Sequence, residues 1–390
     1  MSIKIFSQGI QKLLNVFYLF FDGLILAFTS SVESRKPQVL LVRVDAIGDF
    51  VLWLDSATVL IDHYRKAGYS VVLMANQAWA NWAEDMQIVD EVWEVDVLRF
   101  NKKPIYRSKL ILRIRNRGFK IAIQPTYSRV FRSGDSMMRA SCASERIGSE
   151  GDESNITPWF KSLSNRWFTK LIPAENTPLM ELKRNAEFMR GLGFIEFKAG
   201  LPVIHPVSDA LSYSLPKLPY AVLVPSASWY GRAWPSINFI AIAYRLVECG
   251  LGIVVVGGAK DHDMARDLVD ALPEKVVNLV GKTSLSELVE ILRSASVIIS
   301  NETSSVHIGA AVNAPVVCIL GGGHFGRFAP YQVEVSEDHL NLPTIVTEKM
   351  NCFGCNWQCH YSRQATDPVK CIQDISVEKV WGAVEKILHK

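Results

Sequence analysis

The 390-residue sequence has no dominant charge, no tandem repeat and no low-complexity tract. Its formal net charge at pH 7 is only +3, which excludes a nucleic-acid binder that works through bulk charge. Hydrophobic residues make up 49% of the chain, so the composition is globular, and the length suits two domains of ordinary size. The turn Asp45–Asp49 follows an apolar run but lacks the three-glycine spacing of a dinucleotide fingerprint.

The first 36 residues are mostly apolar and would form a helix with one narrow polar stripe. The stripe consists of Gln11, Asn15, Tyr18 and Asp22. A cleaved signal peptide and a membrane-spanning helix are two interpretations, and Asp22 interrupts the apolar segment in both. An amphipathic helix accommodates the stripe, either in a membrane interface or docked on the protein itself. We predict the interfacial helix, with docking as the alternative.

Short apolar runs alternate with helical periodicity from residue 39 to residue 320, which predicts α/β architecture with parallel strands. A Pro-containing linker between two domains is predicted at residues 202–219. Residues 151–177, with Trp159 and Phe160, are predicted as a loop. Strands are predicted at 39–44, 70–74, 91–95, 120–124, 220–224, 252–256, 296–300 and 316–320.

Polar residues gather where the predicted strand 296–300 ends, and this is the edge of an α/β sheet at which ligands bind. The helix that starts near Ser304 offers free backbone N–H groups and the positive end of its dipole, which suits a phosphate. The alternative is ordinary capping by hydroxyl groups. The residues concerned are Glu302, Thr303, Ser304, Ser305 and His307.

Two further sets of charged residues are candidates for chemistry. Asp49 stands at a helix start, where Asp usually caps, but its carboxylate is also suited to take a proton from a hydroxyl. Arg129 and Arg132 lie in a segment rich in Ser, Arg and Met, and they are candidates to bind an anionic acceptor. A solvated charged face is the alternative.

Four blocks of the sequence resemble the heptosyltransferases of glycosyltransferase family 9. They are residues 41–49 (LVRVDAIGD), 224–239 (VPSASWYGRAWPSINF), 254–261 (VVVGGAKD) and 279–331, in the order and spacing of the family. The resemblance implies a GT-B fold, in which two Rossmann-like domains face a cleft. It implies an acceptor domain at 37–205, a nucleotide-sugar domain at 206–375, and a C-terminal helix at 376–390 that packs back on the first domain.

The resemblance also implies inverting, metal-independent sugar transfer. Asp49 matches the proposed catalytic base of the family, and Arg232 matches a basic residue that grips the donor phosphate, for which a planar guanidinium fork is suited. The remaining donor-binding positions that the resemblance implies are Ser226, Ser228, Gly257, Gly258, Asp261, Glu302, Thr303, Ser304, Ser305 and His307.

Two positions depart from the family pattern. Glu302-Thr303-Ser304 stands where many members have Asp-Thr-Gly, so the acid is longer and a glycine is lost. Asp45 stands where Ser is common, and we include it among the weak acceptor-binding residues. If Asp45 and Asp49 face one cleft, their repulsion would raise the pKa of one of them.

Four of the seven cysteines fall within twenty residues, whereas Cys142, Cys249 and Cys318 are isolated. The cluster is Cys352, Cys355, Cys359 and Cys371. Four sulfurs at this density suit a structural zinc or iron ion. Reduced thiols without a metal, or two disulfides, are the alternatives, and disulfides are rare in a cytoplasmic enzyme.

The sequence therefore predicts an inverting glycosyltransferase, cytoplasmic and peripheral at the inner membrane of a bacterium. It would transfer a sugar, heptose above all, from a nucleoside-diphosphate sugar such as ADP-heptose to a lipopolysaccharide core or a related glycan. Three alternatives remain: a protein-acceptor heptosyltransferase, a nucleotide-sugar isomerase, and a non-catalytic sugar-nucleotide-binding protein of similar fold.

Overall fold

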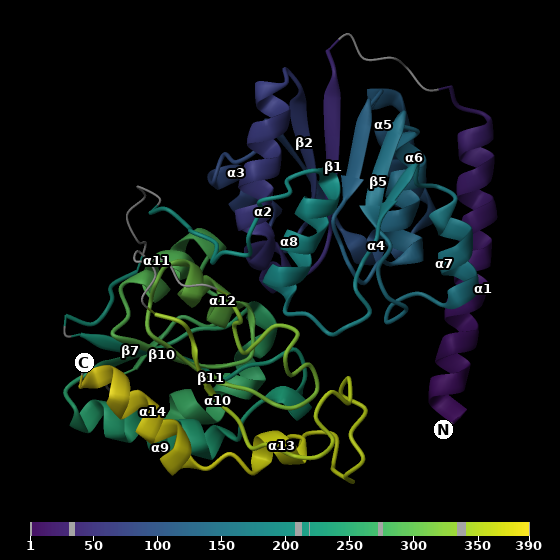
Figure 1. Ribbon diagram of the computed structural model, residues 1–390. Coiled ribbons are helices and arrows are strands. Elements are labelled where there is room, and N and C mark those ends of the chain that lie inside the picture. Colours follow the sequence, from purple (N-terminus) through teal and green to yellow (C-terminus); the bar gives the residue numbers. More distant parts are fainter. Residues whose placement is uncertain are drawn as a thin grey trace. The chain divides into compact units, whose positions relative to one another are not determined.

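The computed structural model describes residues 2–30, 36–206, 213–217, 219–271, 276–333 and 341–389, without the side chains of residues 2–8. The chain forms two compact units, each with its own sheet and covering helices (Figure 1). The first unit comprises residues 1–46, 56–176 and 184–197, and the second comprises 47–55, 177–183 and 198–390. The predicted linker, 202–219, lies partly outside the described residues.

The first unit contains a six-stranded parallel sheet in the order β3-β2-β1-β4-β5-β6. Its central strands are apolar runs buried on both faces, which is typical of a sheet covered by helices on each side. The strands are β1 (Gln38–Arg43), β2 (Ser70–Asn76), β3 (Glu91–Val95), β4 (Ile121–Gln124), β5 (Glu145–Ser149) and β6 (Lys170–Ile172).

The second unit repeats the same topology, with the strand order β12-β11-β10-β7-β8-β9. Every described pairing in both sheets is parallel, and both orders are the doubly wound Rossmann order, so the predicted α/β class is confirmed. The strands are β7 (Tyr220–Val224), β8 (Gly252–Val255), β9 (Val276–Asn278), β10 (Val297–Asn301), β11 (Val316–Ile319) and β12 (Thr344–Val346).

The sequence analysis predicted the edge strand β3 but missed four other strands at or near the sheet edges. β5 and β6 lie where the sequence predicts a basic segment and a loop, and β9 and β12 were not predicted. These strands carry exposed or half-exposed positions, unlike the fully buried β4 and β10. A short half-exposed strand lacks the continuous apolar run by which buried strands are recognised.

Helices cover both sheets. Ser284 is the N-cap of α11 and forms a capping box with Glu287. The helices are α1 (Ser2–Ala27), α2 (Ile47–Lys66), α3 (Ala80–Asp85), α4 (Val97–Lys102), α5 (Pro104–Arg117), α6 (Ser136–Ser141), α7 (Pro158–Asn165), α8 (Glu181–Leu192), α9 (Ser236–Glu248), α10 (His262–Ala271), α11 (Leu285–Arg293), α12 (Ser304–Ala311), α13 (Lys370–Gln373) and α14 (Val377–Leu388).

Helix α14 packs within the second unit. Its buried side chains Val380 and Val384 join the apolar core formed by strands β7, β8, β10 and β11 and by helix α9. Arg245 of α9 also forms an ion pair with Glu378 of α14. The buried face of α14 thus lies against its own sheet, and the expectation that this helix packs back on the first domain stays a prediction.

Helix α1 docks on the first unit through its polar stripe. The Asp22 carboxylate accepts two hydrogen bonds from Arg107 of α5, at 2.7 Å from Nε and 2.5 Å from Nη2, and both side chains are buried. The Tyr18 ring lies under the same guanidinium, 4.5 Å from its carbon, and Gln11 accepts a hydrogen bond from Arg132. The polar residues of the stripe therefore face the protein, in agreement with the docking alternative.

Candidate functional site at the switch point of the second sheet

The strand order of the second sheet reverses between β7 and β10, and this is the position at which doubly wound sheets bind ligands. The two strands pair directly, with Ile299 opposite Leu223 and Ser300 opposite Val224. Their carboxyl ends therefore release residues 225–235 and 302–307 at one edge of the sheet. The donor-binding residues predicted from the sequence on these two loops are brought together by this topology.

Arg232 lies at the centre of this edge, at the end of the short helix η2 (Tyr230–Arg232). Its Nη2 donates to the Glu302 carboxylate at 2.6 Å and to the Glu302 carbonyl at 2.9 Å, and its Nη1 donates to the Ser228 hydroxyl at 3.1 Å. The Nε atom is buried and has no hydrogen-bond partner among the described residues. The guanidinium is therefore fixed in orientation but retains an N–H group for an anionic ligand.

Glu302 is the carboxylate that fixes Arg232. Its side chain is 7% exposed, and this burial raises the pKa of the carboxyl, while the adjacent Arg232 charge acts in the opposite direction. Glu302 stands where many family members have the shorter Asp, and its longer side chain reaches the Arg232 guanidinium. Arg232 and Glu302 therefore form a salt bridge.

Helix α12 begins directly after Glu302 and points its amino end at the same edge. Its N-cap, Thr303, has extended backbone and makes no side-chain hydrogen bond to the first turn. The alternative that the hydroxyl groups serve only to cap helix α12 is therefore wrong for Thr303. The backbone N–H groups of a helix start and its positive dipole end favour a phosphate at this position.

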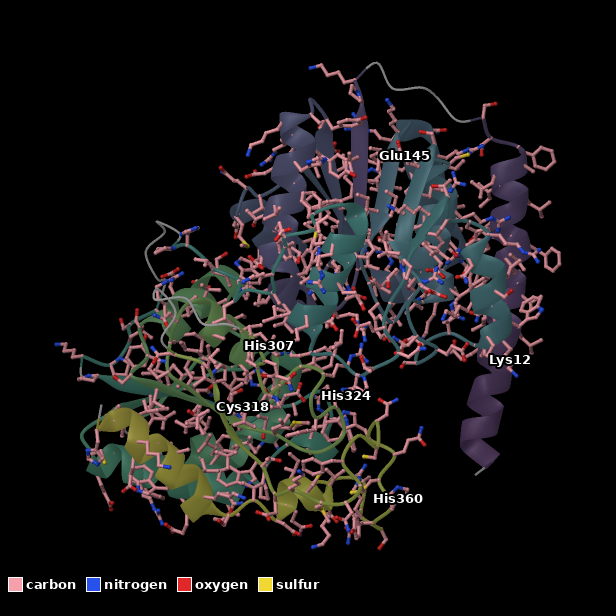
Figure 2. The ribbon with its side chains drawn as sticks, in the orientation of Figure 1. Lys12, Glu145, His307, Cys318, His324 and His360 are labelled. Atoms are coloured by element: carbon pink, nitrogen blue, oxygen red, sulfur yellow. The ribbon has the colours of Figure 1, made fainter. Side chains whose placement is uncertain are left out.

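His307 lies one turn into α12 and is buried, as are most residues of that helix (Figure 2). Its Nδ1 is 2.6 Å from the Tyr331 hydroxyl. Burial, and then the Arg232 charge, lower the pKa of His307 to about 4, so the ring is neutral at physiological pH. A Cβ on Gly48 would lie 3.0 Å from its Cδ2, so only glycine fits against this ring without displacement.

Asn301 is a site residue that the sequence analysis missed. Its fully buried Nδ2 donates to the Pro225 carbonyl at 2.7 Å, and its Oδ1 accepts from the Trp234 N–H at 3.0 Å. It therefore clamps both ends of the loop that carries Arg232. The available signal was a polar side chain at the end of an otherwise apolar strand, since a buried amide needs partners for its donors and acceptor.

The loop after β8 forms a second wall of this edge. The Asp261 carboxylate accepts a hydrogen bond from the Gly258 N–H at 2.7 Å, so it closes the turn at the start of α10. A Cβ on Gly257 would lie 3.2 Å from the Asp261 Cβ and 3.4 Å from the Ser226 hydroxyl. The predicted residues Ser226, Gly257, Gly258 and Asp261 therefore lie together, with Asp261 also engaged in local structure.

Asp49 lies in the first turn of α2, with Ala46 as the N-cap, so Asp49 is not the capping residue. Asp45 has a different environment: its carboxylate lies 3.2 Å from Nε of the buried Arg43 and accepts a hydrogen bond from Thr126 at 2.7 Å. Thr126 follows β4, so this bond joins the two loops at the switch point of the first sheet. The geometry gives Asp45 a structural role.

The proposed acceptor-binding arginines lie inside the first unit. Arg129 is 1% exposed, lies 3.6 Å from the buried Asp135, and covers the Phe168 ring, and burial lowers its pKa. Arg132 is half-buried and bonds to Gln11 of α1. Both guanidinium groups thus make contacts within the first unit, and their binding of an acceptor stays a prediction.

Comparison with known proteins agrees with this geometry. The family model described as glycosyltransferase family 9 (heptosyltransferase) matches residues 198–356, which include the whole edge described above. Residues 198–356 of this chain are therefore similar to glycosyltransferase family 9. A lipooligosaccharide heptosyltransferase 2 of Haemophilus influenzae is 33% identical over 94 residues, and lipopolysaccharide heptosyltransferase 3 of Escherichia coli is 25% identical over 245 residues.

These alignments cover 23% and 59% of this chain, and 27% and 64% of the respective relatives. The chain thus spans about a quarter of the length of the first relatives it matches. Among solved structures, the family 9 glycosyl transferase of Veillonella parvula superposes with a TM-score of 0.67 at 16% identity, covering 93% of this chain and 99% of that one.

Two other solved structures share the fold. The E. coli heptosyltransferase WaaC with ADP-2-deoxy-2-fluoro heptose has a TM-score of 0.62 at 16% identity and covers 90% of this chain and 99% of its own. The iron-containing dodecameric glycosyltransferase TibC of E. coli has a TM-score of 0.52 at 14% identity and covers 93% and 78%. At these identities the likeness establishes the two-domain GT-B-type fold.

The four clustered cysteines lie on the loop between β12 and α13 and on α13, beside the Arg232 edge of the second sheet. Cys352, Cys355, Cys359 and Cys371 line one cavity together with Trp357. The Trp357 ring lies 4.9 Å from the guanidinium carbon of Arg232 and packs edge-on against Trp229 at 6.2 Å. The cysteine loop therefore packs against the Arg232 side chain through Trp357.

Proposed function

We propose that this protein is an inverting glycosyltransferase that moves a sugar, heptose above all, from a nucleoside-diphosphate sugar to a lipopolysaccharide core or a related glycan. One observation carries the proposal: Arg232 is fixed by Glu302 and Ser228 at the switch point, beside the start of α12. This is an arrangement for a diphosphate, with a guanidinium fork and a helix amino end at one sheet edge. ADP-heptose is the donor we favour, and WaaC has been solved with such a ligand.

The proposed transfer requires a base and a stabilised leaving group. The Asp49 carboxylate takes the proton of the acceptor hydroxyl, whose oxygen attacks the anomeric carbon of the donor. The bond between that carbon and the diphosphate oxygen breaks, and the nucleoside diphosphate leaves with the electron pair. Arg232 and the first N–H groups of α12 stabilise the developing negative charge, and the sugar configuration inverts.

Nucleotide binding provides the direct test of the donor. We expect ADP to raise the melting temperature of the protein more than GDP, UDP or CMP, because a ligand that binds only the native state stabilises it by mass action. The measurement is a thermal-shift titration of each nucleotide. A larger shift with another nucleotide would change the proposed donor, and no shift with any of them would contradict the glycosyltransferase proposal.

We further propose that the cysteine cluster holds a structural zinc or iron ion that takes no part in the transfer. All seven cysteines are among the described residues and each is a free thiol. Within the described ranges no group of three or more His, Cys, Asp or Glu side chains is close enough to hold a metal ion as placed. The donor set nevertheless fits, because four thiols line one cavity and tetrahedral Cys₄ sites need only that set.

Two local features support this metal proposal. The Gly322 N–H donates to the Cys371 sulfur at 3.3 Å, and such a bond stabilises a thiolate. Burial, and also the neighbouring Cys352, Cys355 and Cys359, raise the pKa of Cys371. A bound cation would lower the pKa of Cys371 again, because metal ligation removes the thiol proton. TibC, which shares the fold, is an iron-containing protein.

Elemental analysis of the purified protein tests the metal site. We expect close to one zinc or iron ion per chain, and a marked loss of metal with a lower melting temperature in Cys355→Ser. Cys249→Ser is the matched control, since Cys249 is an exposed thiol outside the cluster, and it should leave the metal content unchanged. Trace metal in the unmodified protein would refute the site.

We place the enzyme in the cytoplasm, peripheral at the inner membrane, where a growing lipopolysaccharide core is accessible to it. The described residues contain one helix that is long and apolar enough to cross a membrane, near the amino end. The polar stripe of that helix, α1, contacts the rest of the first unit, so only its other side can contact a membrane.

A further inference from the structure

Helix α1 presents its apolar face away from the protein. Its polar stripe faces the first unit, so the arrangement is the reverse of an ordinary surface helix, whose apolar side faces the core. The outward residues recur every three or four positions over about 27 Å of helix. They are Ile10, Leu13, Phe17, Phe20, Leu24 and Phe28, and Phe28, the last of them, is 86% exposed.

We propose that this outward face, together with helices α4 and α5, binds the surface of an anionic lipid bilayer. The helix would lie in the plane of the headgroups with its phenylalanine and leucine side chains in the acyl region. This surface is separate from the sugar-donor edge and does not depend on the proposed transfer.

The Asp22–Arg107 ion pair excludes a spanning orientation while α1 is docked. Arg107 is fully buried, and besides Asp22 it donates to the carbonyls of Phe100 and Arg132. Withdrawing α1 into a bilayer would leave the guanidinium buried without its carboxylate and would place Asp22 in hydrocarbon. The docked helix can meet lipid only along its outward side.

Helix α5, which is next to α1, and helix α4 before it are basic. Residues 97–117 contain eight Lys or Arg and no Asp or Glu, and four of the eight form ion pairs with Asp22, Glu91 or Asp96. Helix α5 packs against α1, and the exposed Lys102, Lys103 and Lys109 belong to this basic segment. Basic residues near a bilayer attract anionic headgroups. The charge of the segment thus complements an anionic surface.

Exposed apolar side chains accompany this charge. Leu98 of α4 is 62% exposed and Ile105 of α5 is 74% exposed. Trp159 of α7 is 61% exposed, and its neighbour Phe160 packs in the small cluster that also contacts Leu19 of α1. Tryptophan and basic residues around an apolar face are typical of a membrane-interface surface.

A second copy of the chain is a less suitable occupant of this face. A twofold pair through α1 would use the same surface of both copies, and would bring the two basic α4–α5 segments to one interface. Like charges at an interface oppose association. The same charge favours a bilayer that contains anionic lipid.

Vesicle flotation of the full-length protein, without donor or acceptor, tests the proposal. We expect the protein to float with vesicles of phosphatidylethanolamine and phosphatidylglycerol, and to float less with phosphatidylcholine alone or at high salt. The triple variant Leu13→Ser, Phe17→Ser, Phe20→Ser should reduce the bound fraction at least tenfold. Lys102→Gln, Lys103→Gln, Lys109→Gln should reduce binding to the anionic vesicles only.

The matched control is Ile195→Ser, Ile237→Ser, Tyr244→Ser, which removes three exposed apolar side chains elsewhere and should leave flotation unchanged. Unchanged melting temperatures would show that the variants remain folded. Full flotation of the α1 triple variant would overturn the proposal. The proposal would also be overturned if the unmodified protein did not bind vesicles and instead formed concentration-dependent dimers, measured by sedimentation, that the α1 triple variant abolished.

Discussion

Asp49→Asn is expected to lower the rate of sugar transfer by about 10²–10⁴-fold, the usual contribution of a positioned general base. The substitution keeps the size of the side chain but removes the carboxylate that takes the acceptor proton. Asp49 lies in the first turn of α2, where Ala46 is the N-cap, so a simple loss of the cap does not explain such an effect.

The measurement separates binding from chemistry. Release of ADP from ADP-heptose with an acceptor gives kcat, and the nucleotide thermal shift gives donor binding in the same variant. We expect kcat to fall while the shift remains, because the base acts on the acceptor hydroxyl and not on the diphosphate. Asp62→Asn is the matched control, since Asp62 is an exposed residue of the same helix. A nearly active Asp49→Asn enzyme would remove Asp49 from the mechanism.

The central part of each sheet could be predicted from the sequence, because its strands are buried apolar runs with no polar interruption. The β10 run Val297–Asn301 is fully buried, and its end marks the donor turn without any knowledge of the fold. Parallel pairing then brings the β7 and β10 loops to one edge. The family resemblance implied one site for residues of both loops, and this pairing accounts for their proximity.

The partners of individual charges could not be predicted, because they depend on tertiary distances. Arg129 and Arg132 have the composition of an anion-binding strip, yet one is buried against Asp135 and the other bonds to α1. Asp22 appeared to be a defect in an apolar helix, and its partner Arg107 is 85 residues away. Opposite-charge pairing across such separations leaves no periodic signal in the sequence.

Arg232→Ala is expected to lower kcat/KM by about 10²–10³-fold, the effect of removing one preorganised donor from a developing anion. It should also destabilise the fold by about 3 kcal/mol, the lower end for breaking a buried pair, because Arg232 is itself partly exposed. The loss arises from Glu302, whose carboxylate would be left buried without its cation. The measurements are steady-state kinetics and thermal unfolding.

The pH dependence identifies Glu302 as the source of this instability. Burial raises the pKa of Glu302 in the folded state above that of the unfolded chain, and Arg232 opposes this effect. Without Arg232 the folded pKa rises further, so above the ordinary carboxyl pKa of about 4.3 the folded state binds more protons than the unfolded state. Stability then falls as pH increases. The stability deficit of Arg232→Ala should therefore be small near pH 5 and larger near pH 8.

Two further variants separate the structural effect from the catalytic one. Adding Glu302→Gln to Arg232→Ala should remove the extra pH dependence without restoring transfer, because the buried charge is gone but the guanidinium is still absent. Arg232→Lys should recover most of the stability and little of the donor affinity, since an ammonium pairs with a carboxylate but lacks the planar fork. The exposed Arg266, which pairs with Asp263 on α10, provides the neutral control Arg266→Ala. Equal pH profiles for Arg232→Ala and the double variant would show that the ion pair does not control stability, and would leave Arg232 as a ligand contact alone.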